Sequence, residues 1–219
     1  MKKINVVTID GPSASGKGVL AKGSAIHFNF KLLDRGILYR LFAYFFNLNL
    51  SNEEIAAKIN NVISFKLEEE SFKIFNLSDD ITTYLRSEDI AKVASKLSSQ
   101  KEVRESLFLI QRNFYDGKGI VADGRDMGSV VFEDAKLKIF LTASPEVRAK
   151  RRYLELQNRG QEVNMPALMA DIEKRDLKDS SRELSPLLPA DEAHIIDSSE
   201  MSLEEVFSIT KNLIKKELI

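Results

Sequence analysis

Cysteine and tryptophan are absent from the 219 residues of this chain, and histidine occurs only twice. Without cysteine the chain has neither disulfides nor thiolate metal sites, and two histidines are too few for a histidine cluster. We therefore expect His27 and His194 to be structural, and we expect no metal site built from protein ligands alone.

Long apolar runs are also lacking, since none approaches the roughly 18 residues of a membrane-spanning helix. The start of the chain lacks the apolar stretch and the cleavage site of a signal peptide. We therefore expect a cytoplasmic protein that contacts no membrane.

An excess of charge of either sign is absent as well. The 32 lysines and arginines are balanced by 33 aspartates and glutamates, so that the net charge is -1. Such a chain has no general attraction to nucleic acid, and any cationic binding site must be local. The length allows one well-packed core with room for a small insertion.

The most informative stretch is a glycine-rich segment near the start of the chain. It runs from Gly11 to Lys17, between an apolar run from Ile4 to Ile9 and a helix expected over residues 18–28. Backbone N–H groups of such a loop can surround a phosphate, while the lysine and the helix N-terminus add positive charge. This context favours a phosphate-binding loop over a glycine-rich turn with an exposed lysine.

The loop lacks the hydroxyl with which the common motif ends. In that motif a serine or threonine after the lysine contacts magnesium, whereas here Gly18 and Val19 follow Lys17. Loss of a hydrogen bond to a charged group costs about 1.5–3 kcal/mol unless a water takes its place. We expect this difference to slow catalysis at most.

Two further predicted strands end in charged residues. Residues 31–34 form a short run that ends in a carboxylate, and a helix expected over residues 36–48 places Tyr39 and Arg40 close to the strand's end. Residues 119–128 form an apolar strand followed by two aspartates, an arginine and glycines. Ligands of open α/β sheets bind at the carboxyl ends of the strands, so we expect these side chains in a binding site.

The remaining pattern indicates packing and an insertion. Residues 63–67 and 72–75 alternate apolar and polar side chains, which predicts an antiparallel hairpin. Aromatic residues at helical spacing are expected to pack in the core, and these are Phe42, Tyr44, Phe45 and Phe46. Helix-capping patterns begin at Ser51, Ser87, Ser144 and Ser202.

Basic residues accumulate in two helices expected after Ser144. They are Arg148, Lys150, Arg151, Arg152, Arg159, Lys174, Arg175, Lys178 and Arg182. These side chains could form a solvated basic face. Because the same chain carries a phosphate-binding loop, we favour a lid that closes positive charge over transferring phosphates and excludes water.

The alternation of strands and helices predicts an α/β fold of the P-loop NTPase type, with three layers and a central parallel sheet of five strands. The core is expected over residues 1–60, 100–150 and 185–219. A small antiparallel subdomain is expected as an insertion near residues 61–99, and a helical lid near residues 151–184.

Several motifs occur together along the chain. They are Ile9-Asp10-Gly11-Pro12-Ser13 with Gly16-Lys17-Gly18, Leu33-Asp34 with Gly36, Tyr39-Arg40, Val103-Arg104-Glu105, Gln111-Arg112, residues 122–128, Arg151-Arg152, and Arg175-Asp176 with Asp179 and Arg182. Together they resemble the bacterial cytidylate kinases, which belong to the nucleoside monophosphate kinases, over nearly the whole chain. The run from Asp123 to Gly128 and the order of the arginines are the most specific of these features.

The resemblance implies that the chain transfers the γ-phosphoryl group of ATP to CMP or dCMP, with Mg2+ held mainly by phosphates and water. It implies that ATP contacts Gly11, Pro12, Ser13, Ala14, Ser15, Gly16, Lys17, Gly18 and Val19. It implies that the acceptor contacts Asp34, Arg35, Tyr39, Arg40, Ser95, Arg104, Asp123, Arg125, Asp126, Arg175, Asp179 and Arg182. Of these, Ser95, Arg104 and Asp126 would face the cytosine. The catalytic residues that it implies are Lys17, Arg125, Arg151, Arg152 and Arg175.

Two positions depart from the family pattern. Val19 stands where the family usually has threonine, and Arg35 stands where it usually has serine. The first change affects the magnesium and the donor phosphates, whereas an arginine at position 35 could reach the acceptor phosphate. We expect altered kinetics with activity retained, in a monomer whose partners are small nucleotides.

Other functions stay open at this point. A kinase of the same fold could act on UMP, AMP or a non-nucleotide acceptor, but a carboxylate such as Asp126 beside Arg104 complements the amino donor and the acceptors of cytosine. A nucleotide-binding regulatory protein without turnover would not need the acceptor-side arginines. A translational GTPase or a nucleic-acid motor is disfavoured, because the guanine-reading Asn-Lys-x-Asp segment and a basic track are both absent.

Overall fold

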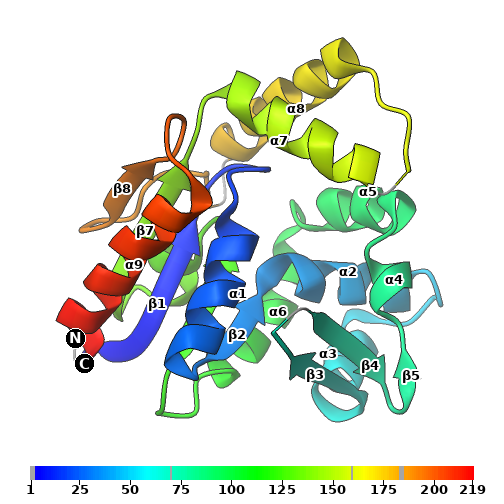
Figure 1. Ribbon diagram of the computed structural model, residues 1–219. Helices are drawn as coiled ribbons and strands as arrows, with labels where there is room; N and C mark the ends of the chain where they lie inside the picture. The colour runs from blue at the N-terminus through cyan, green and yellow to red at the C-terminus, as the bar shows by residue number, and fades with distance from the viewer. Residues whose placement is uncertain (1–2, 70, 159, 183–184) are drawn as a thin grey trace.

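The computed structural model describes residues 3–69, 71–158, 160–182 and 185–219 (Figure 1). Its centre is a sheet of five parallel strands in the order β2-β6-β1-β7-β8. The strands are β1 (Ile4–Asp10), β2 (Lys31–Asp34), β6 (Ile120–Gly124), β7 (Ala135–Thr142) and β8 (His194–Asp197). The predicted parallel sheet of five strands is confirmed, and the phosphate-binding loop leaves the carboxyl end of its middle strand.

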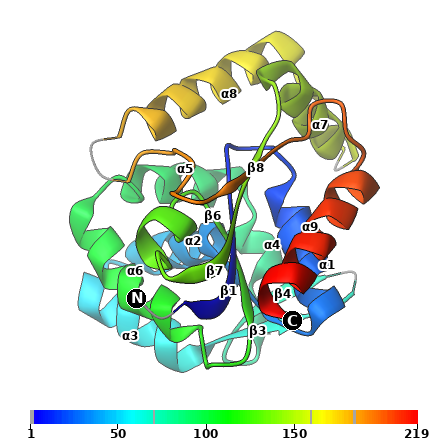
Figure 2. The ribbon, with the colours of Figure 1, turned by 90° about the vertical axis from the view of Figure 1, so that its left-hand side faces the viewer.

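Helices cover both faces of this sheet, which gives the predicted three layers. Helices α1 (Lys17–Phe28) and α9 (Leu203–Leu218) lie on one face, and α2 (Arg35–Phe46) and α6 (Lys101–Asn113) lie on the other (Figure 2). Helix α3 (Asn52–Val62) packs against α2 and α6. None of the helices in the described ranges is long and apolar enough to cross a membrane.

The insertion begins with the predicted hairpin, whose strands are β3 (Ile63–Leu67) and β4 (Phe72–Asn76). Strand β5 (Asp79–Asp80) and helix α4 (Thr82–Leu85) follow and were not predicted. Two aspartates carry no apolar alternation, so their pairing depends on the neighbouring strand rather than on their own pattern. Helix α5 (Glu88–Leu97) then begins at its Ser87 cap, as predicted.

Two long helices, α7 (Pro145–Asn158) and α8 (Met165–Ser180), pack against each other at the carboxyl edge of the sheet (Figures 1 and 2). The Ser144 hydroxyl accepts a hydrogen bond from the backbone N–H of Val147 at 3.3 Å, which caps the start of α7. The first of these helices follows directly on β7, so that it leaves the sheet beside the phosphate-binding loop.

Local signals fixed most element ends, with a few differences. The capping boxes at Ser51 and Ser202 are both formed. The expected burial of Phe46 is wrong, because this last residue of α2 is 44% exposed, whereas Phe42 and Phe45 are buried. A short π-helical turn, η1 (Met127–Val131), follows β6 and was not predicted.

Candidate active site

The carboxyl ends of three adjacent strands bring the predicted site residues to one edge of the sheet. In the register of the sheet, Asp34 of β2 pairs with Asp123 of β6, and Asp10 of β1 pairs with Gly124 of β6. The residues that follow these three strands therefore all start at the same edge of the sheet. This is the edge at which ligands bind in open α/β sheets.

The phosphate-binding loop has the backbone geometry that an anion site requires. Gly11 packs so closely on β7 that a β-carbon there would lie 2.0 Å from the carbonyl oxygen of Leu141. Ala14 and Gly16 both have positive φ angles, of 60° and 93°. Gly16 is the N-cap of α1 and provides no side-chain cap, which leaves the first N–H groups of the helix available to a phosphate.

Lys17 points into its own loop. Its Nζ donates a hydrogen bond to the carbonyl oxygen of Pro12 at 3.0 Å. Burial lowers the pKa of Lys17 to about 8, although the carboxylate of Asp123 favours the charged form. Arg125 and Arg175 add repulsion. A phosphate bound here would restore the full charge of the lysine, so the site is built to favour an anion.

Asp10 ties the loop to the segment that follows β6, a role that the sequence pattern did not reveal. Its two carboxylate oxygens accept hydrogen bonds from the backbone N–H groups of Met127 and Gly128, at 2.9 and 2.8 Å. The side chain is 4% exposed. Burial raises the pKa of Asp10 to about 7 in spite of these two donors.

The raised pKa of Asp10 predicts a pH dependence of stability. The folded chain binds this proton more tightly than the unfolded chain, whose Asp has the ordinary pKa of 3.8. This contribution is therefore fully present below pH 3.8 and is lost as the pH rises to about 7. Urea unfolding of the parent and of Asp10→Asn across pH 4–7 is expected to give a difference in unfolding free energy that falls with rising pH. A difference in unfolding free energy that stays constant over this pH range would contradict the raised pKa of Asp10.

A cavity of about 250 Å3, here called the arginine cavity, opens beside the phosphate-binding loop. The predicted site residues that line it are Ser13, Ala14, Lys17, Asp34, Arg35, Tyr39, Arg40, Ser95, Asp123, Arg125, Arg152 and Arg175. They come from the loop and the start of α1, from the ends of β2 and β6, from α2, from the insertion and from the two long helices. The structure thus brings together residues that are far apart in the sequence, in a cavity suited to a small anion.

The arginines of this cavity are held in place by specific partners. Arg40 donates to the carbonyl oxygens of Leu85 and Ser87, at 2.7 and 3.2 Å. Arg125 donates through Nε to Asp179 at 2.5 Å, and Arg182 donates to the other oxygen of the same carboxylate. Repulsion by Arg125, together with burial of part of the side chain, lowers the pKa of Arg175 to about 10, so it stays charged at neutral pH. The cluster is therefore preorganised and strongly cationic.

A second cavity of about 200 Å3, the Asp126 cavity, lies next to the first, and Tyr39 lines both. Arg104 and Asp126 line it and form an ion pair, with side chains that are 12% and 2% exposed. Burial disfavours the charged form of Asp126, but Arg35 and Arg104 outweigh this and hold the pKa of the carboxyl below its usual range. Asp126 is thus a buried carboxylate that stays ionised.

A third cavity, of about 410 Å3, lies on the other side of the loop and is here called the α9 cavity. Leu20, Leu141, Met201, Leu203 and Val206 supply an apolar lining, and Val19 reaches it with 59% of its surface exposed. Its residues before and within α9 carry no motif, so sequence reasoning missed them.

Arg151 also lines the α9 cavity. It donates to the carbonyl oxygen of Ser15 at 3.1 Å and to that of Ser198 at 2.7 Å. The guanidinium of Arg152, by contrast, pairs with Glu88 of the insertion and with Glu155, at 2.7 and 2.8 Å. The two neighbouring arginines therefore anchor α7 to different parts of the molecule.

The expectation of a basic lid face is wrong for Arg148, which is 3% exposed. Its guanidinium donates to the carbonyl oxygens of Ala143 and Ser13, at 2.9 and 3.3 Å, and to Asp176 at 2.5 Å. Arg148 therefore joins the end of β7, the phosphate-binding loop and α8. Lys150 is exposed, and Arg159 lies outside the described residues.

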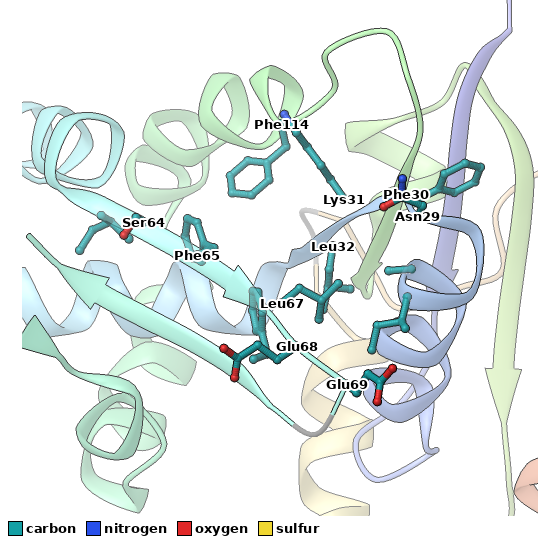
Figure 3. A pocket seen from close by; sticks show the side chains of 14 residues that line it. Asn29, Phe30, Lys31, Leu32, Ser64, Phe65, Leu67, Glu68, Glu69 and Phe114 are labelled. Carbon is teal, nitrogen blue, oxygen red and sulfur yellow. The ribbon is translucent and has the colours of Figure 1, made fainter. Parts of the chain in front are cut away.

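Not every cavity belongs to this cluster. A space of about 750 Å3 lies at the opposite end of α1 from the loop, between β2 and the hairpin strand β3 (Figure 3). Its walls include the aromatic rings of Phe30, Phe65 and Phe114. None of the predicted site residues lines it. Arg112 pairs with Asp134 at 2.7 Å, and its side chain lines neither the arginine cavity nor the Asp126 cavity.

Comparison of the fold with solved structures supports the architecture. A crystal structure of TT1252 from Thermus thermophilus matches with a TM-score of 0.51 and 14% identity, and the match covers 100% of both chains. An uncharacterised protein from Eubacterium ventriosum also matches with a TM-score of 0.51, at 12% identity, over 96% of this chain and 98% of that one. At these identities the likeness shows the fold alone.

Comparison of the sequence goes further. A cytidylate kinase of Shewanella sp. (strain MR-4) is 41% identical over 220 residues, which covers 97% of this chain and 96% of the relative. A cytidylate kinase of Shewanella frigidimarina is 43% identical over 208 residues, or 92% of this chain and 91% of the relative. The sequence model of the cytidylate kinase family matches residues 7–216. This chain therefore belongs to the cytidylate kinase family.

Proposed function

We propose that this chain is a (d)CMP kinase, which transfers the γ-phosphoryl group of ATP to CMP or dCMP and gives ADP with CDP or dCDP. The observation that carries this proposal is the buried, ionised Asp126 beside Arg104, in a cavity next to the arginine cavity that adjoins the phosphate-binding loop. Such a carboxylate can accept a hydrogen bond from the amino group of cytosine. Its membership of the cytidylate kinase family agrees with this function.

The donor would lie on the loop side. The backbone N–H groups of residues 11–19 and Lys17 would hold the phosphates of ATP. The apolar lining of the α9 cavity suits a flat purine, with Arg151 at its wall. The acceptor phosphate would contact Arg40, Arg125 and Arg175, which line the arginine cavity.

The rest of the acceptor would extend away from the loop. Asp179, with Arg182 beside it, would contact the sugar, and Ser95 would help to hold the base. Arg182 and Asp179 are already paired in this structure. The working unit that we propose is a monomer.

The chemistry requires little beyond position and charge. Phosphoryl transfer spreads negative charge over the equatorial oxygens, so a protein accelerates it by aligning donor and acceptor and by neutralising that charge. Lys17 approaches the reacting phosphate from the loop, and Arg125 and Arg175 approach it from the acceptor side. Arg152 lies on α7 above the same cavity and would help the two long helices to exclude water.

Magnesium fits the site as a water-held ion. No group of three or more acidic or histidine side chains within the described residues could hold a metal by itself. Asp123, however, has a buried Oδ1 without a hydrogen-bond partner among the described residues. Gly18 leaves space beside it, since a β-carbon there would lie 3.3 Å from Oδ2. Asp123 would hold the water shell of the ion, which when bound neutralises phosphate charge.

Position 19 lacks the hydroxyl of the common motif, and restoring it is predicted to have a small effect on kcat. Val19 is exposed, so water can occupy the place that a threonine hydroxyl would take. We expect Val19→Thr to raise kcat by less than about tenfold, since tenfold corresponds to roughly 1.4 kcal/mol. Val19→Ala is the matched control for the loss of the apolar contact. A larger gain, specific to threonine, would show that water does not replace the hydroxyl.

Direct analysis of products tests the proposed function. Protein incubated with ATP, magnesium and CMP is expected to produce CDP and ADP in equal amounts, as followed by chromatography. Binding of both nucleotides without CDP would instead support the regulatory protein without turnover.

A further inference from the structure

Arg35 is a buried cation whose position is defined from three sides. Its side chain is 4% exposed, and its Nε lies 2.9 Å from Oδ1 of Asp126. Its guanidinium carbon lies 4.3 Å above the centre of the Tyr39 ring. Gly124 leaves room for its stem, because a β-carbon there would lie 3.1 Å from Cδ of Arg35. A cation this deeply buried is retained only with charged or hydrogen-bonding partners.

Two polar atoms in this arrangement lack hydrogen-bond partners. Within the described part of the chain, both Nη2 of Arg35 and Oδ1 of Asp126 are buried and make no hydrogen bond. Oδ1 of Asp126 lies close to Nε of Arg35 as an ion pair but outside hydrogen-bond geometry. Buried polar groups in folded proteins are nearly always paired, so such an adjacent donor and acceptor indicate a place for a ligand group.

The location of the pair agrees with this reading. Arg35 lines the arginine cavity, Asp126 lines the Asp126 cavity, and Tyr39 lies between them as part of both linings. Arg35 is directed at Asp126 and not at the phosphate-binding loop. Its guanidinium therefore faces the carboxylate assigned to the acceptor base, from a position on the wall of the neighbouring arginine cavity.

We propose that Arg35 is a specificity-determining residue that reads the acceptor base together with Asp126. Cytosine presents an amino donor beside a ring nitrogen and a carbonyl oxygen that both accept. Asp126 would accept from the amino group while Nη2 of Arg35 donates to one of the neighbouring acceptors. Uracil presents a carbonyl and an N–H where cytosine has the amino group and the ring acceptor, which would leave the buried pair unsatisfied. This inference rests on the proposed function.

The test compares Arg35→Lys and Arg35→Met with the parent, using CMP and UMP as acceptors. Lysine keeps the charge but not the planar fork, and methionine keeps only the bulk of the stem. We expect kcat/KM for CMP to fall in both variants and kcat/KM for UMP to fall less, so that the ratio of CMP to UMP decreases by about tenfold or more. Arg112→Met is the control, because this partly buried arginine pairs with Asp134 and its side chain lines neither cavity.

A purely structural role would be revealed by an unchanged ratio with equal losses on both acceptors, and this result would overturn the proposal. Arg35→Lys retains a partner for Asp126, so it supplies the ratio should Arg35→Met fail to fold. Calorimetry gives the dissociation constants of CMP and UMP for the parent and for Arg35→Lys, and so measures the same discrimination without turnover. A parent that binds CMP in preference to UMP but forms no CDP would contradict the proposed function and not the role of Arg35.

Discussion

Replacing Lys17 by alanine is expected to lower kcat for phosphoryl transfer by about 10²–10³-fold, the usual cost of removing one preorganised donor at the reacting charge. The lysine lies within hydrogen-bond distance of its own loop. Burial lowers its pKa to about 8, and a bound phosphate would restore its charge. The loss should therefore appear in the chemical step as well as in the affinity for ATP.

Steady-state kinetics with saturating ATP separates the two effects. Lys22→Ala on the same helix is the matched control, since Lys22 follows the loop by more than one turn, and its kcat is expected to equal that of the parent. If Lys17→Ala raised KM for ATP without changing kcat, the lysine would contribute binding alone.

Replacing Arg148 by methionine is expected to lower the free energy of unfolding by about 3 kcal/mol, because removing one partner of a buried ion pair leaves the others unsatisfied. The carbonyl oxygens of Ala143 and Ser13 would each lose a donor, and Asp176 would lose its guanidinium. Because Ser13 belongs to the phosphate-binding loop, we also expect weaker ATP binding.

Urea unfolding measures this effect. Arg152→Met is the matched control on the same helix, because the side chain of Arg152 is 27% exposed and its ion pairs with Glu88 and Glu155 lie near the surface. Such pairs contribute at most about 1 kcal/mol. Equal losses in the two variants would mean that burial of Arg148 does not govern its contribution.

The parts of the fold that could be predicted from the sequence depend on local chemistry. The phosphate-binding loop needs glycines, because Gly11 packs against a carbonyl oxygen and Gly16 has a positive φ angle. Helix starts depend on a serine that accepts from the backbone N–H three residues on, as Ser51 and Ser202 do. Such signals lie within a few residues of their effect.

The parts that could not be predicted depend on contacts between distant segments. The sequence predicts Arg148 to be one of several surface cations. Only the fold shows that it contacts Asp176 of α8 and the backbone of Ser13. The apolar lining of the α9 cavity has no motif, because any suitably placed leucine or methionine serves. The resemblance named Arg35 as a residue of the acceptor site, but its contact with Asp126 follows from the pairing of β2 with β6.

The most direct test of the central claim is a coupled assay of ADP release with ATP and magnesium, in which CMP, dCMP, UMP and AMP are offered separately. We predict turnover on the cytidine nucleotides, with kcat/KM for CMP at least tenfold above that for UMP, as one well-matched pair of buried polar groups allows (about 1.4 kcal/mol). Equal use of UMP or AMP, or no turnover with any acceptor by protein that binds ATP and CMP, would contradict the assignment of Asp126, Arg104 and the surrounding arginines to a cytidylate kinase site.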